Sequence, residues 1–288
     1  MDLAELIPIA IRTSVFLLVF ALGLGANFEE ALYLLRRPAQ LLKSLLAMNI
    51  VMPVLAVMLV AAFDLHYALQ VALIALALSP VPPILPKKQL KAGGSAYYTV
   101  GLLFSAALFT IVSIPLSVEI IGRIFDKPAY ITPARVALIV SITVIAPLAA
   151  GILVRHFAPR FAERIARPVS LFATVALLVG VLPIVFAAWP AAVALVGNGT
   201  LAATAVFVVS GLAAGHVLGG PDPDDRVVLA LATATRHPGV AMAVAHAAAP
   251  GEKLVLGAVL WHLIIGLIAS AIYIAWRRRQ ADARPVEL

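Results

Sequence analysis

Arg236 and His237 are the residues whose types and position most clearly suggest chemistry. They lie in the middle of an apolar stretch, residues 229–246, and directly precede Pro238. Proline has no backbone N–H and its ring clashes with the carbonyl four residues back, so the stretch should be a broken helix. Freed backbone at membrane depth survives only where protein or a wet cavity satisfies it. An arginine there is a functional candidate, since its planar fork binds carboxylate, phosphate or sulfate groups through two parallel hydrogen bonds.

A second interruption is predicted between residues 79 and 88, where four prolines fall within seven residues and Lys87 and Lys88 follow. No ordinary helix continues through such a run. The alternative is an ordinary proline-rich loop between two short spans. The run from Tyr67 to Pro80 is short for a full crossing, which favours a broken helix.

Other polar residues complete the predicted substrate site. His237 and His262 could carry a coupling proton, since histidine titrates near neutral pH; alternatively, each bonds backbone freed at a break. Asn49 either bonds a neighbouring helix or contacts the ligand. Thr235 directly precedes Arg236 and is assigned to the same site. No carboxylate pair, nucleophile–base set or metal-ligand cluster is visible at membrane depth, so we expect no enzyme, no metal and no cofactor.

The elements that must position these residues are membrane helices. The chain is 63% hydrophobic and 12% charged, and long apolar runs recur, which predicts an all-α polytopic membrane protein. The net charge of +7 reflects Lys and Arg at helix ends rather than nucleic-acid binding, and the chain has no Cys. We expect about nine transmembrane helices, over residues 7–24, 45–63, 67–91, 96–114, 135–154, 169–188, 201–218, 229–246 and 254–276.

Basic residues also predict the orientation in a cell membrane. With the N-terminus outside and the C-terminus in the cytoplasm, the four most basic segments all lie inside, as the positive-inside rule requires. These segments are residues 27–43, 87–91, 155–167 and 277–279.

The two predicted breaks occupy matching places, each in the third span of a group of four. One span separates the groups, so the two halves insert with opposite orientations. Paired interrupted spans in two inverted halves are the strongest sequence indication of a secondary transporter. We therefore expect the two broken helices to cross near the midplane, where helix ends point partial positive charge at whatever binds.

On these features the chain resembles the bile acid/sodium symporter family over roughly residues 5–276. The resemblance rests on Gly23-Leu24-Gly25, Asn49 to Pro53, Ser79-Pro80, Gly239 to Ala243 and Val259 to His262. It implies an inverted-repeat core, residues 45–116 and 198–276, and a panel, residues 7–26 and 133–188, within one membrane domain spanning 1–288. It also implies alternating access and organic anion substrates.

The chain departs from this family at both breaks. Residues 81–86 replace the family's Gly-Gly-x-Ala-Ser-Asn run, Ala232 aligns with the carboxylate that serves both sodium sites, and Arg236 replaces a Gln ligand. Sodium prefers a shell of oxygens, and a guanidinium repels a nearby cation. The resemblance and these departures together predict that the two sodium sites do not operate. Arg236, with Lys87 or Lys88, would hold the crossing together and attract an anion instead.

The sequence thus predicts a secondary active transporter of an organic anion that works by alternating access. The alternative is a sodium-coupled, bile acid-like symporter, and a different class is a non-transporting membrane sensor or scaffold. The expected partners are a small anionic substrate and the lipid bilayer. The substrate itself, the coupling ion, the direction of transport and the oligomeric state stay open.

Overall fold

The computed structural model describes residues 3–124, 132–197 and 199–282, and every regular element within them is a helix. In chain order the helices are α1 (Leu3–Gly25), α2 (Phe28–Leu32), α3 (Pro38–Leu46), the π-helical turn η1 (Ala47–Val51), α4 (Met52–Ala62), α5 (Tyr67–Leu78), α6 (Leu85–Lys91), α7 (Ala96–Ile124), α8 (Pro133–Val140), the π-helical turn η2 (Ser141–Ile145), α9 (Ala146–Phe157), α10 (Pro159–Ala194), α11 (Thr200–Leu218), α12 (Pro223–Ala234), α13 (Pro238–Ala248) and α14 (Val255–Asp282).

The predicted all-α polytopic membrane fold is confirmed. Eight helical segments among the described residues are long and apolar enough to cross a membrane. The predicted third crossing is not among them, because it is divided between α5 and α6. The 12 residues of α5 cover roughly 18 Å at 1.5 Å per residue, less than a bilayer core.

Both predicted interruptions are present. α5 ends at Leu78 and α6 begins at Leu85, while α12 ends at Ala234 and α13 begins at Pro238. Asp222 caps the start of α12 by accepting a hydrogen bond from the Asp224 N–H. The halves pair crosswise: α5 packs against α13, and α6 packs against α12. Two antiparallel broken helices that cross at their breaks have this pairing, so the predicted crossing is confirmed.

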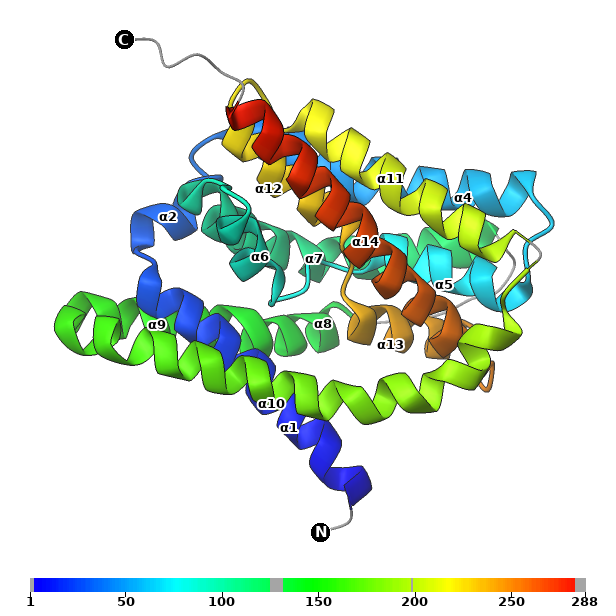
Figure 1. Ribbon diagram of the computed structural model, residues 1–288, viewed down its shortest axis with the longest axis horizontal. Coiled ribbons are helices and arrows are strands. Elements are labelled where there is room, and N and C mark those ends of the chain that lie inside the picture. The colour runs from blue at the N-terminus through cyan, green and yellow to red at the C-terminus, as the bar shows by residue number, and fades with distance from the viewer. Residues whose placement is uncertain (1–2, 125–131, 198, 283–288) are drawn as a thin grey trace.

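The helices lie in two layers, seen edge-on in Figure 1. α1, α8, η2, α9 and α10 form the first layer, and α4, α5, α11, α12, α13 and α14 belong to the second. Within the first layer α1 crosses α9 closely, since a Cβ on Gly23 would lie 2.4 Å from the Leu148 carbonyl oxygen. Small residues at such crossings let membrane helices approach when no hydrophobic force draws them together.

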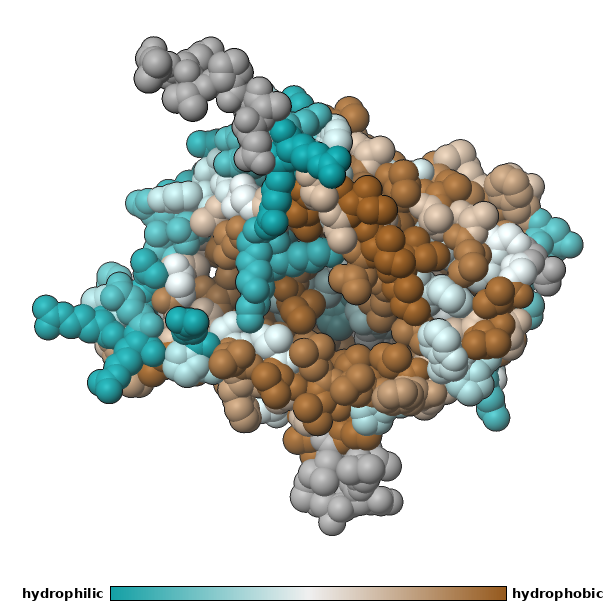
Figure 2. All heavy atoms as spheres, viewed as in Figure 1, coloured by the Kyte–Doolittle hydropathy of each residue, from teal (hydrophilic) through white to brown (hydrophobic). Residues whose placement is uncertain are grey.

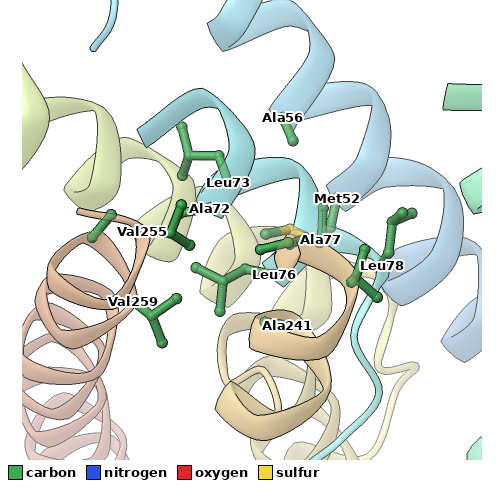
Figure 3. Packing of buried hydrophobic residues seen from close by; sticks show 14 of the residues in the cluster. Met52, Ala56, Ala72, Leu73, Leu76, Ala77, Leu78, Ala241, Val255 and Val259 are labelled. Carbon is green, nitrogen blue, oxygen red and sulfur yellow. The ribbon is translucent and has the colours of Figure 1, made fainter. Parts of the chain in front are cut away.

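The half-helix α5 is buried among three neighbours. Figure 3 shows Leu73, Leu76 and Leu78 of α5 amid side chains from α4, α13 and α14. Most of its residues are buried, so protein surrounds this apolar segment although it is too short to span a membrane. Its packing fixes the position of its C-terminal end, where the first break begins.

The surface is mostly hydrophobic between two more polar ends. In Figure 2 hydrophilic residues gather at the left of the view, over α2 and the turn between α9 and α10, and in a column that descends from the C-terminal end of α14, while hydrophobic residues dominate the rest of the middle. The basic segment 155–167, placed between spans in the sequence analysis, is largely helical, because α10 begins at Pro159 and continues to Ala194. Hydropathy detects the membrane-crossing part of a helix and misses its polar extension.

Candidate functional site: the crossing of the broken helices

Arg236 lies at the point where the two breaks meet. Its Nη1 donates to the Ser79 carbonyl oxygen at 3.1 Å, and its Nη2 donates to the Met48 carbonyl oxygen at 2.7 Å. The side chain is 1% exposed. One guanidinium therefore ties three segments together: η1, the first break and the second break.

The two carbonyls that accept from Arg236 are free because prolines follow them at helical spacing. In a helix the Ser79 carbonyl would accept from residue 83, or from residue 82 in a tighter turn, and both are prolines without an N–H. The Met48 carbonyl lies in a π-helical turn, where its partner would be residue 53, also a proline. Buried carbonyls need a donor, and Arg236 supplies it.

His237 joins the breaks through its backbone. Its N–H donates to the Pro80 carbonyl oxygen at 3.0 Å. Its Nδ1 accepts from the Val240 N–H at 3.3 Å, which makes His237 the N-cap of α13. An accepting Nδ1 places the ring proton on Nε2. Of the two roles left open for His237, this geometry is that of a residue bonding freed backbone.

Backbone carbonyl oxygens, rather than a carboxylate, accept from the Arg236 guanidinium. No carboxylate among the described residues forms an ion pair with it. α5 and α12 both end at the crossing, and the C-terminal end of a helix carries partial negative charge from its unpaired carbonyls. α6 and α13 begin at the same crossing with partial positive charge, so the direct hydrogen bonds to carbonyl oxygens are what hold the guanidinium. Its Nε is buried and has no hydrogen-bond partner.

The structure brings three more of the predicted site residues to the region of the crossing. Thr235 ends α12, and Asn49 follows Met48 within η1; both are half-buried. His262, on α14, is 2% exposed and packs edge-on against the Phe207 ring. Its Nδ1 is buried without a partner.

Lys87 lies elsewhere, at the boundary between the two layers. Its ammonium donates to the Thr174 hydroxyl at 3.0 Å and to the Ser170 hydroxyl at 3.2 Å, both on α10. Lys87 and Ser170 line a cavity of about 220 Å³, whose other walls come from α1, α2, the first break, α7 and two further residues of α6, Pro86 and Leu90. Neither Arg236 nor Lys88 is part of its lining.

The sequence analysis missed Ser170 and Thr174. They lie four residues apart on α10, a spacing that places two hydroxyls on one helical face. That spacing is common in membrane helices, and it indicates a site only when the structure shows Lys87 bonded to both hydroxyls.

The profile of the Sodium Bile acid symporter family matches residues 13–195, more than half of the chain. The matched region includes the first break, Lys87 and α10, and it ends before Arg236 and the second break. None of the curated proteins matches the chain.

Proposed function

Because the chain belongs to the sodium bile acid symporter family, a family of membrane transporters rather than enzymes, we propose that it carries an organic anion across the membrane by alternating access, with Arg236 in place of the family's sodium ions. One observation carries the proposal. The buried guanidinium bonds carbonyls of η1 and the first break, and it belongs to the second break itself.

A cation at this position would stabilise the crossing in the way that Arg236 does. The carbonyl oxygens of Ser79 and Met48 favour positive charge at this position. By the resemblance, the carboxylate that would hold sodium is Ala232 here, and a second cation beside Arg236 would be repelled. A fixed charge needs no ion gradient, so the coupling of this carrier differs from sodium symport.

Alternating access needs two bodies that move against each other. We assign residues 45–116 and 198–276 to a core and residues 7–26 and 133–188 to a panel, and the layered arrangement in Figure 1 supports this division. The layers touch closely where α14 meets α10, since a Cβ on Gly257 would lie 2.4 Å from the Ala191 carbonyl carbon. Toward the other end of α10 they enclose the cavity at Lys87.

The cavity faces the cytoplasm if the predicted orientation holds, because the basic segments 27–43 and 87–91 lie at that end. Since the chain has no Cys, single cysteines report orientation without background labelling. A membrane-impermeant maleimide applied to intact cells should label Lys253→Cys and spare Lys91→Cys, both of which are exposed positions. The opposite labelling pattern would reverse the assignment.

Sodium titration of the purified protein tests the proposal without a known substrate. An ion that binds only the folded state raises the free energy of unfolding by mass action, by about 2.7 kcal/mol at one hundred times its Kd. The melting temperature rises with it. We expect equal melting temperatures in sodium chloride and choline chloride of the same concentration. A saturable, sodium-specific rise, or sodium-stimulated uptake into proteoliposomes, would favour the sodium-coupled symporter.

Direct anion binding by Arg236 stays a prediction, together with ligand roles for His237, His262, Asn49 and Thr235. If Arg236 is itself a ligand, Arg236→Ala should abolish the anion-dependent shift in a thermal-shift screen against organic anions, and Arg236→Lys should retain part of it. Unchanged responses in both variants would leave Arg236 with its bridging role alone. A chain that binds no anion and transports none would be the sensor or scaffold.

A further inference from the structure

We propose that the cavity between α6 and α10 binds a small organic acid with a single negative charge, and that this acid replaces the Ser170 and Thr174 hydroxyls on the Lys87 ammonium. The inference rests on the proposed transport function and names its substrate class. It also makes the two hydroxyls determinants of affinity.

The charge at the cavity wall is the first argument. An ammonium has three N–H donors, and the two hydroxyls that accept from Lys87 are neutral. No carboxylate among the described residues forms an ion pair with it. The positive charge therefore remains available to an anion that enters the cavity.

A second charge at the wall limits the ligand to one negative charge. Glu30 also lines the cavity, and its Oε2 accepts from the Asn27 N–H at 3.0 Å as part of the cap of α2. This hydrogen bond holds the carboxylate in place. A dianion would neutralise Lys87 with one group and meet repulsion from Glu30 with the other.

Size and lining define the rest of the ligand. The volume of about 220 Å³ lies below the roughly 300–1,000 Å³ that drug-sized ligands occupy. Most of the wall is aliphatic, with Leu18, Leu22, Leu90 and Val100 among its residues. A compact acid with a branched or short aliphatic body fits these walls, and a steroid is too large.

The hydroxyls and the acid compete for the same donors. Thr174 Oγ1 donates its own hydrogen to the Ser170 carbonyl at 2.6 Å, so its lone pairs face Lys87. When a carboxylate takes the ammonium, these bonds between α6 and α10 are lost. Ligand binding therefore loosens one connection between the core and the panel, which is the step an alternating-access carrier needs.

Thermal-shift titrations of the purified full chain in sodium-free buffer test the proposal. The probes are 2-methylbutyrate as the small monoacid, adipate as the dianion and cholate as the steroid acid. We expect 2-methylbutyrate to stabilise the protein, and adipate and cholate to leave the melting temperature unchanged. Stabilisation by cholate or adipate with none by 2-methylbutyrate would overturn the substrate class.

Three variants separate the roles. Lys87→Met should abolish the shift, while Lys91→Met, an exposed lysine one turn further along α6, should bind like the parent. The double variant Ser170→Ala/Thr174→Val removes the competing acceptors, so its affinity for 2-methylbutyrate should rise about threefold to tenfold. A fall in affinity would show that the hydroxyls are ligands rather than competitors and would overturn the exchange.

The outcome is distinguishable from a failure of the proposed function. Binding that depends on both Lys87 and sodium would leave this site standing and refute the sodium-free carrier. Sodium-independent binding of another anion, unchanged by Lys87→Met, would refute the Lys87 site and leave the sodium-free carrier standing.

Discussion

The two breaks interrupt their helices in chemically opposite ways. The first, residues 79–84, contains three prolines, so it is poor in N–H donors and rich in free carbonyls. The second, residues 235–237, contains no proline, and it contributes the Arg236 guanidinium and the His237 N–H. Pro238 begins α13, where a missing N–H leaves nothing unpaired.

This difference makes the crossing complementary. Acceptors of the first break meet donors of the second, in two hydrogen bonds that join Ser79 to Arg236 and Pro80 to His237. Two breaks of the same kind would leave either carbonyls or N–H groups unpaired at membrane depth, at a cost of several kcal/mol each. The prolines, which leave carbonyls free, and the arginine, which donates to them, therefore stabilise the same crossing, although they lie in different halves of the chain.

Removing the donor should have the largest effect on this complementarity. Arg236→Met leaves the buried carbonyls of Ser79 and Met48 without a partner, and we expect a loss of about 2–4 kcal/mol in stability. Arg236→Lys keeps the charge but lacks the fork, so its loss should be smaller. Thermal melts of purified protein in detergent measure both. If Arg236→Met melts like the parent, the guanidinium does not hold the breaks together.

Restoring a donor to the first break should weaken the pairing by a smaller amount. Pro83→Ala supplies an N–H at helical spacing from the Ser79 carbonyl, where it competes with Arg236. We expect a loss of about 1 kcal/mol in the parent and little or none in the Arg236→Met background. A double-mutant cycle measures this coupling. Equal effects in both backgrounds would show that Pro83 shapes the chain without serving the crossing.

The positions of the breaks could be predicted because proline acts through covalent geometry. The first break has prolines at 80, 82 and 83, which remove three N–H donors within four residues, so it is visible in the sequence. A single proline is a weaker signal, because α10 continues through the isolated Pro168, Pro183 and Pro190. The long apolar runs are visible as well, since their length and composition match a bilayer.

The partners of Arg236 could not be predicted from the sequence. Its acceptors are backbone carbonyls that lie 157 and 188 residues away along the chain, and every residue has a carbonyl. Only the packing of α5 and η1 selects these two. The contact of Lys87 with α10 is hidden for the same reason, since hydroxyls four residues apart are common in membrane helices.

The cap of α13 gives a further test of the second break, which supplies the hydrogen-bond donors. His237→Leu removes the Nδ1 that accepts from the Val240 N–H and should cost about 1 kcal/mol, whereas His237→Asn can still cap the helix and should cost less. Melting temperatures of the two variants measure the difference. If His237 instead carries a coupling proton, both variants should lose the pH dependence of transport equally, regardless of their stability.

The smallest expected effect concerns the third segment tied by Arg236. Pro53→Ala supplies an N–H that can pair with the Met48 carbonyl within the π-helical turn, so this carbonyl no longer depends on Arg236. Because the Arg236 bond to Met48 is short, at 2.7 Å, the new donor should displace it only in part. We expect the cost of Arg236→Met to fall by about 0.5 kcal/mol in the Pro53→Ala background. A cost that stays unchanged, measured in the same melts, would confine the complementarity to the two breaks and exclude η1 from it.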